Sequence, residues 1–363
     1  MRHLATISLL ACISSTAAAQ TAGFVYTQSN SASGNEVIAL QRDASGGLTM
    51  QSKTATGGLG LGMGLGSQGS VVLVTDTRKL LVVNAGSNSL SVFRLDSAGP
   101  TLIDVEPTQG IMPTSVAERD GRVYVLNAGG TGQIVGYSLN QAGVLLPLPG
   151  QPAPLSSAMA AAAQVGITPD GKQLICTERA TNTIGVYPIA PDGSIGQAQF
   201  FRSHGMTPFG FEFARGNNLI VSEAFGGAPD ASAVSSYKLQ QTGLPTLVSA
   251  SVPTMETAAC WIANTANGRF SYTTNTGSGT VSGYRVMPTS AQLESLNADG
   301  ITGNLGTGAN PLDASISSDS QYLYVLSPAT SEIAAFRIGM TGHLSKLPSY
   351  TGIPATGFGL AAR

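Results

Sequence analysis

The segment GRFSYTTNTGSGTVSGYRV, from Gly268 to Val286, contains the pattern that decides the fold. It begins with a turn, continues with a short run ending at Asn275, passes a Gly/Ser/Thr corner and ends in an alternating run. Runs rich in Val, Tyr, Phe and Thr between Gly and Asn residues are typical of antiparallel strands joined by tight turns. The segment therefore predicts two neighbouring strands of one sheet.

The same pattern returns along the whole chain, giving seven copies. Their aromatic-like positions are Leu40, Phe93, Tyr137, Tyr187, Tyr237, Tyr284 and Phe336. By subtraction of residue numbers, successive copies are 44 to 53 residues apart, and each holds about four short strands. Repeats of this length and strand content are the signature of β-propeller blades. We predict an all-β fold, a seven-bladed β-propeller with four antiparallel strands per blade, as a single domain over residues 20–363.

The two ends of the chain do not follow the order of the other repeats. Residues 24–27 look like a second strand with no first strand before them, and residues 355–362 look like a first strand alone. Pairing these two segments removes a free sheet edge. We therefore predict that the C-terminal strand completes the first blade.

The first nineteen residues are expected to be a signal peptide. Arg2 and His3 precede an apolar run over residues 4–13, too short to span a bilayer. Small residues up to Ala19 fit a cleavage site. This predicts a periplasmic or secreted protein. A lipoprotein site at Cys12 is the alternative, and no later segment is long and apolar enough to cross a membrane.

Composition excludes several classes of function. Charged residues make up 10% of the chain, with 18 Lys and Arg against 20 Asp and Glu, so nucleic-acid binding is not expected. After cleavage only His204 and His343 remain, which excludes a multi-histidine metal site, and we expect no metal and no cofactor. Cys176 and Cys260 are expected to be buried thiols rather than a disulfide.

Candidate site residues gather where the second strands are expected to end. Strand alternation places these ends on one face of the propeller, where a funnel would bind a small molecule. Glu223 and Glu178 are the candidate catalytic residues. The candidate substrate-binding residues are Arg179, Arg202, His204, Asn84, Asn127, Asn275 and Trp261. The alternatives are simpler: exposed carboxylates paired with the arginines, strand-end asparagines bonded to local backbone, and a Trp261 that packs in the core.

With these motifs in view, the chain resembles the lactonase-type seven-bladed β-propellers, a group with bacterial 6-phosphogluconolactonases and fungal carboxymuconate cyclases. The resemblance rests on the turn Thr-Pro-Asp-Gly at 168–171 and on the runs at 177–184, 222–227 and 274–279, and it is strongest with secreted bacterial members. It implies a catalytic Glu at the end of a second strand, which Glu223 matches. The family's Arg-His pair falls on Phe209 and Gly210, and its earlier His falls near Ala163 or Gln164, so those groups are missing here.

Three functions remain open on this reading. The first is an exported lactonase-like hydrolase that opens a small sugar-type lactone with a rim carboxylate as base. The alternative is a non-catalytic propeller that binds a sugar, a peptide or a cell-wall component, which the missing Arg-His pair favours. A carboxymuconate-type cyclase comes third, because its substrate's carboxylates need several cations. We expect a monomer.

Overall fold

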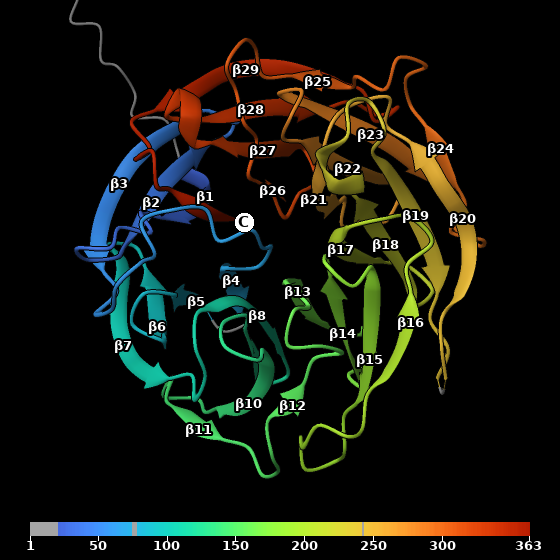
Figure 1. The fold of residues 1–363 in the computed structure, drawn as a ribbon. Coiled ribbons are helices and arrows are strands. Elements are labelled where there is room, and N and C mark those ends of the chain that lie inside the picture. The colour runs from blue at the N-terminus through green and yellow to red at the C-terminus, as the bar shows by residue number, and fades with distance from the viewer. Residues whose placement is uncertain (1–20, 75–77, 242) are drawn as a thin grey trace, which may run out of the picture.

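The computed structural model describes residues 21–74, 78–241 and 243–363, and seven antiparallel sheets surround one axis (Figure 1). The prediction of a seven-bladed propeller is confirmed. The expected signal peptide, with Cys12, lies outside the described residues.

Each blade runs from an inner strand at the axis to an outer fourth strand. The inner strands are β4 (Val71–Val74), β8 (Pro113–Arg119), β13 (Ala162–Ile167), β17 (Pro208–Ala214), β21 (Ala259–Asn264), β26 (Asp313–Ile316) and β30 (Phe358–Ala362). The second strands are β5 (Lys79–Asn84), β9 (Arg122–Asn127), β14 (Gln173–Glu178), β18 (Asn218–Glu223), β22 (Phe270–Asn275), β27 (Tyr322–Ser327) and β1 (Thr21–Gln28).

The third and fourth strands form the outer half of each blade. The third strands are β6 (Ser89–Asp96), β10 (Gln133–Leu139), β15 (Thr183–Pro188), β19 (Ala233–Lys238), β23 (Thr280–Val286), β28 (Glu332–Ile338) and β2 (Glu36–Asp43). The fourth are β7 (Gly99–Pro107), β11 (Leu145–Pro147) with β12 (Ala153–Pro154), β16 (Gln199–Arg202), β20 (Thr246–Pro253), β24 (Leu293–Ser295) with β25 (Gly303–Asn304), β29 (Leu344–Thr351) and β3 (Leu48–Ala55). Two 3-10 turns, Phe225–Gly227 and Pro328–Thr330, follow second strands.

The C-terminal strand closes the ring, as predicted. β30 pairs antiparallel with β1, with Tyr26 opposite Ala361 and Gln28 opposite Phe358. Beyond the pair, the amide of Phe24 donates to the carbonyl of Arg363 at 3.0 Å and the amide of Arg363 donates back at 2.9 Å. Both ends of the described chain are therefore held in one sheet.

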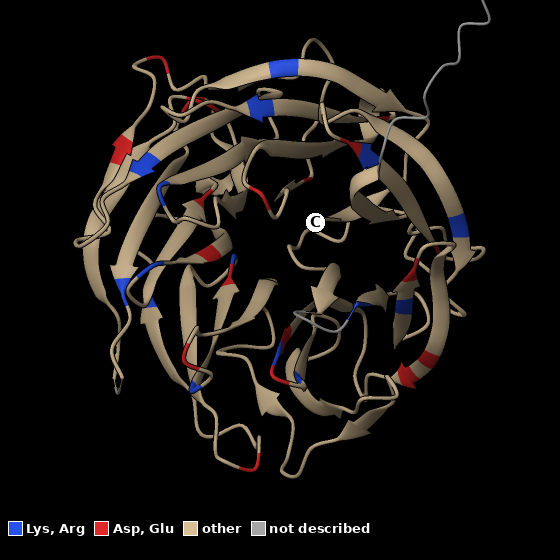
Figure 2. Ribbon diagram, turned by 180° about the vertical axis from the view of Figure 1, so that it is seen from behind, with Lys and Arg blue, Asp and Glu red and all other residues tan. Residues whose placement is uncertain are grey.

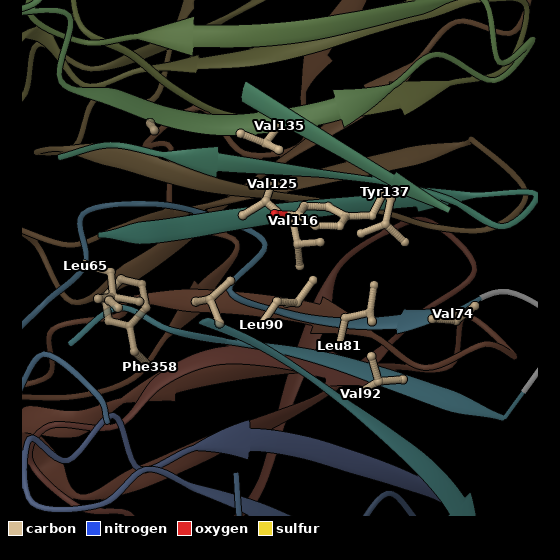
Figure 3. Close-up of a cluster of buried hydrophobic side chains, with 14 of the residues drawn as sticks. Leu65, Val74, Leu81, Leu90, Val92, Val116, Val125, Val135, Tyr137 and Phe358 are labelled. Atoms are coloured by element: carbon tan, nitrogen blue, oxygen red, sulfur yellow. The ribbon is translucent and has the colours of Figure 1, made fainter. Parts of the chain in front are cut away.

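Apolar side chains between adjacent blades form the core. In Figure 3, Leu81, Leu90 and Val92 of the second blade face Val116 and Val125 of the third. The aromatic-like positions that aligned the repeats all lie in third strands, with at most 3% of their surface exposed. The sequence period therefore corresponds to a real packing position, repeated once per blade.

Polar side chains of the inner strands also join neighbouring blades, by hydrogen bonds to the backbone of the next inner strand. The side-chain Nε2 of Gln164 on β13 donates to the carbonyl of Phe211 on β17 at 3.0 Å. The side-chain Oε1 of Gln164 accepts from the Phe211 N–H at 2.7 Å. The Ser315 hydroxyl on β26 accepts from the Ala362 N–H on β30 at 3.0 Å. These bonds fix the inner strands at the spacing that leaves an open axis.

Candidate functional site

The predicted ring of second-strand ends exists, and its side chains are buried. Asn84, Asn127, Glu178, Glu223 and Asn275 are each the last residue of a second strand, with no exposed surface. Four of them contact the crossover segment that leads into the inner strand of their own blade, whereas Asn275 bonds to Thr280 and Ser282 on β23.

Glu178 is held by the crossover that enters its own blade. Its carboxylate accepts hydrogen bonds from the Ser156 N–H at 2.8 Å, from the Ser156 hydroxyl, and from the Thr181 hydroxyl at 2.8 Å. Ser156 lies between β12 and β13, so this carboxylate ties the incoming crossover to the end of β14.

Glu223 repeats the arrangement one blade later. It accepts from the Gly205 N–H at 2.8 Å and from the Ser251 hydroxyl at 2.6 Å, with the Ser203 hydroxyl at 3.5 Å. A Cβ atom at position 205 would overlap the Glu223 carboxylate, so only glycine fits there. The space around Glu223 is thus filled by its own chain.

The strand-end asparagines have the same kind of surroundings. The Asn84 side chain accepts from the Thr56 hydroxyl at 2.7 Å and donates to the Ser91 hydroxyl at 2.8 Å. The Asn127 side chain donates to the Thr108 carbonyl at 3.1 Å, and that of Asn275 donates to the Ser282 hydroxyl at 2.8 Å. The partners are therefore mostly Ser and Thr hydroxyls, with one distant backbone carbonyl, rather than the local backbone of the simpler alternative.

The two arginines predicted at the rim lie apart from each other. Arg202 is exposed at the end of β16, on the outer edge of its blade. Arg179 is half-buried near the axis, where its Nε donates to the Ala161 carbonyl at 2.9 Å and its guanidinium stacks over Phe209 at 5.4 Å. Burial lowers the pKa of Arg179. His204 is exposed, and its backbone N–H donates to the Tyr237 hydroxyl at 2.9 Å.

The axis is closed at this end by the crossover between the first two blades. Trp261, 2% exposed, donates its indole N–H to the Ser67 carbonyl at 2.8 Å and packs against Phe209 and Phe358. Leu65 joins the same apolar cluster. Trp261, Leu65 and Ser67 therefore form a plug at this end of the axis, and Trp261 is not the floor of an open funnel.

A cavity of about 340 Å³ lies along the axis below this plug. It runs from Gln68 along six of the inner strands to Glu118 and Phe213. These two residues lie near the turns that join inner strands to second strands. Three carboxyl groups line it: Glu118 on β8, Glu212 on β17 and Asp313 on β26. Among the described residues that line it there is no Lys, Arg or His, and acidic ribbon segments lie close to the axis in Figure 2.

Two of these carboxyl groups have perturbed acidity. Burial raises the pKa of Glu212 to about 7. Burial also raises the pKa of Asp313 well above its usual range, and the nearby charge of Glu212 adds to the effect. Asp313 accepts backbone N–H bonds from Ala314 at 2.7 Å and Leu360 at 2.9 Å. Near neutral pH the cavity therefore combines a Glu212 close to its midpoint with an Asp313 whose burial favours the protonated form against its two backbone N–H bonds, a pairing suited to acid-base chemistry.

The repeat pattern did not point to Glu212, Asp313 or Glu118, because these carboxyl groups lie on inner strands and not at the ends of second strands. The available signal was a carboxylate inside an otherwise apolar strand, as in Pro208–Ala214, PFGFEFA. Such a residue has to face either the core or the axis. A buried unpaired carboxylate in the core is costly, so the axis was the consistent choice.

Nothing in the described part of the chain points to a metal centre or a disulfide. No group of three or more His, Cys, Asp or Glu residues in it is placed to hold a metal ion. Cys176 and Cys260 are buried free thiols. No helix among these residues has the length and apolar character needed to cross a membrane.

Comparison with known proteins agrees with this architecture. Residues 138–260 match the family model described as Lactonase, 7-bladed beta-propeller. This stretch is part of the chain only. It includes β13 to β20 and therefore Glu178, Glu212 and Glu223. The chain matches no curated protein sequence.

Several solved structures share the fold over nearly the whole chain. The periplasmic gluconolactonase of Pseudomonas aeruginosa superposes with a TM-score of 0.75 at 18% identity, covering 94% of this chain and 98% of that one. A candidate 6-phosphogluconolactonase of Bacteroides fragilis gives 0.72 at 19%, with the same coverages. A protein of Lactobacillus plantarum gives 0.75 at 17%, covering 95% and 100%. At these identities the likeness shows the fold.

Proposed function

We propose that this protein is an exported lactonase that opens a small, uncharged lactone in the axial cavity, with Glu212 as the general base. The observation that carries the proposal is a carboxyl group with a pKa of about 7 facing an open cavity. A general base works best when its pKa is near the operating pH. The match of residues 138–260 to the lactonase family model supports the reaction class.

The chemistry follows from the two carboxyl groups. Ionised Glu212 takes a proton from water, and the resulting hydroxide adds to the lactone carbonyl carbon. The carbonyl oxygen becomes an oxyanion, which accepts a hydrogen bond from protonated Asp313. The ring C–O bond then breaks, and the leaving alkoxide receives the proton held by Glu212. Lactone and water become one hydroxy acid.

The charge of the cavity favours release of the product. The hydroxy acid ionises, and its carboxylate then lies near the carboxylates of Glu118 and Glu212, with no cation among the described lining residues to hold it. Carboxylates that share one cavity repel each other. A tricarboxylate substrate would meet the same repulsion on entry, which argues against carboxymuconate-type cyclisation.

The rim offers a second location for the base, at Glu223 or Glu178. A base there needs substrate to displace contacts such as Gly205 N–H to Glu223. Gln substitutions separate the two locations. We expect Glu212→Gln to lower kcat on gluconolactone by about 100-fold or more, while Glu223→Gln keeps activity in proportion to its folded fraction. Glu294→Gln, exposed on β24, is the matched control.

A non-catalytic binding propeller is the second candidate function, because none of the described residues that line the cavity is a cation that could stabilise an oxyanion. Thermal stabilisation by gluconolactone without acid release, in wild type and all three variants, would establish the binder and overturn the hydrolase. Loss of turnover in Glu223→Gln with full turnover in Glu212→Gln would move the base to the rim.

A further inference from the structure

Two glutamine side chains line the axial cavity near its plugged end, and both are braced against the backbone. Gln68 and Gln164 are 6% and 8% exposed, and both belong to the cavity lining. Each amide is bonded through its oxygen and its nitrogen, Gln68 to Ile262 on β21 and Gln164 to Phe211 on β17. A planar amide held at both polar atoms cannot turn about its last side-chain bond, so its orientation is fixed.

Each of these amides keeps one donor without a protein partner. A side-chain NH2 group carries two N–H donors. The Gln68 Nε2 donates to the Ile262 carbonyl at 2.7 Å, and the Gln164 Nε2 donates to the Phe211 carbonyl at 3.0 Å. Neither nitrogen has a further acceptor among the residues that the structure describes. Because both side chains border the cavity, the second N–H of each is free to bind a molecule there.

Strand β17 brings the two amides next to the proposed base. A Cβ atom on Gly210 would overlap the Gln68 Oε1, so the Gln68 amide lies against Gly210 and only glycine leaves it room. The Gln164 amide is bonded to Phe211, and Glu212 follows in the same strand. Because these three residues of β17 are consecutive, the two amides and the carboxyl group follow one another from the plug toward the open end of the cavity.

We propose that the side-chain amides of Gln68 and Gln164 bind the carbonyl oxygen of the lactone and stabilise the oxyanion formed from it. This role rests on the hydrolysis proposed for the same cavity. None of the described lining residues is a cation, so a developing negative charge has to be met by neutral donors. Neutral donors that are already oriented stabilise an oxyanion strongly in a site shielded from water.

The order of the groups along β17 agrees with the chemistry of ring opening. With the carbonyl oxygen at the two amides, the carbonyl carbon lies toward Glu212, which takes a proton from water. The hydroxide adds to this carbon, the π electron pair moves onto the oxygen, and both N–H bonds to it strengthen. When the ring C–O bond breaks, the carbonyl re-forms and the leaving oxygen receives the proton from Glu212. The two amides therefore favour an uncharged ring with an exposed carbonyl oxygen.

NMR of the wild-type protein tests the two amide groups directly. In 15N-labelled protein each Gln side chain gives two proton signals on one nitrogen, which the variants Gln68→Met and Gln164→Met assign. Gluconolactam, a non-hydrolysable analogue with the same ring carbonyl, should move the free amide proton of each glutamine downfield. The exposed Gln141 is the internal control and should not respond. Failure of the lactam to bind, or binding that leaves both amide signals unchanged, would overturn the proposal.

Kinetics distinguish a donor to the substrate from a brace between strands. Gln164→Met keeps the length of the side chain and removes both amide atoms, so we expect kcat on gluconolactone to fall about 100-fold with KM little changed. Ser115→Ala is the matched control. The Ser115 hydroxyl accepts from the Val165 N–H at 3.2 Å and braces β8 to β13, but it is not part of the cavity lining.

The control should lower the Tm and keep kcat, with both variants referred to their folded fraction by circular dichroism. Full kcat in Gln164→Met, or equal losses of kcat in the two variants, would contradict the donor role. Shifted amide protons in a protein that releases no acid would keep the carbonyl site and reject the hydrolase. Turnover that is lost in Glu212→Gln, with amide signals that ignore the lactam, would keep the base and reject the two donors.

Discussion

Gln68 and Ile262 are joined by two hydrogen bonds from opposite sides of the axis. The Gln68 side-chain amide donates to the Ile262 carbonyl at 2.7 Å and accepts from the Ile262 N–H at 3.0 Å. Gln68 belongs to the crossover between the first and second blades, whereas Ile262 lies on β21 of the sixth. This pair anchors the plug, which separates the axial cavity from the face of the propeller that carries the crossovers between blades.

Replacing Gln68 by alanine should destabilise the protein. Ile262 would keep a buried N–H and a buried carbonyl without partners, at a cost of about 1–3 kcal/mol for each group. We expect the free energy of unfolding to fall by roughly 2–4 kcal/mol, measured by urea denaturation. Gln141→Ala, at an exposed position, is the control and should stay within about 0.5 kcal/mol of wild type. Equal stability of the two variants would mean that the plug contributes nothing.

Removing residues 356–363 should lower the Tm sharply. The deletion exposes the inner edge of β1 and removes Phe358 and Leu360, which are 1% and 5% exposed. An unpaired sheet edge and lost apolar burial both favour opening of the ring. A synthetic peptide of residues 356–363, added to the truncated protein, should recover part of the lost Tm in calorimetry. An unchanged melting curve after truncation would contradict closure by this strand.

The blades were predictable because their pattern repeats. Each third strand needs a large side chain at one position, as with Tyr187 and Tyr284, and each second strand ends in a polar residue. The closure by Phe358–Ala362 followed from a missing first strand at the N-terminus. Such features recur at a fixed spacing, so local patterns were sufficient to place them.

The environment of the candidate site was not predictable in the same way. Glu223 looked like an accessible rim carboxylate, yet Gly205 and Ser251 cover it from sequence positions 18 and 28 residues away. The plug depends on Gln68 meeting Ile262, 194 residues later. Such contacts depend on how the ring closes, and strand periodicity contains no information about that. Glu212 is visible in the sequence as a carboxylate within an apolar strand. That it lines the axial cavity follows only from the closed ring.

Glu223→Ala should destabilise the protein by about 2–4 kcal/mol. The substitution leaves the buried Gly205 N–H and the Ser251 hydroxyl without their acceptor, and bonds to charged groups are the stronger ones. Glu294→Ala on exposed β24 is the control and should change stability little. Urea denaturation at pH 7 measures both. If Glu223→Ala were as stable as the control while turnover vanished, the rim carboxylate would be catalytic rather than a support for the crossover.

The stability of the wild type should fall as the pH rises from about 5 to 7. The pKa of Glu212 is raised in the folded state, so unfolding releases a proton in this range and becomes more favourable with increasing pH. Glu212→Gln removes this dependence. We expect the variant to gain up to about 3 kcal/mol over the wild type at pH 8, taking about 1.4 kcal/mol per pKa unit. At pH 4, where both states bind the proton, the gain should disappear. A constant difference across the range would contradict burial of the Glu212 carboxyl.

A phosphate group on the substrate should reduce turnover strongly. The axial cavity presents the carboxylates of Glu118 and Glu212, and its described lining residues include no cation, so a phosphorylated lactone meets like charge. We expect kcat/KM for 6-phosphogluconolactone to be at least about tenfold below that for gluconolactone, since 1.4 kcal/mol of repulsion is enough for that factor. Added salt should narrow the gap by screening. Glu118→Gln removes one charge at the mouth and should narrow it further, with gluconolactone turnover as the internal control. A phosphorylated substrate used equally well would place the reaction outside this cavity.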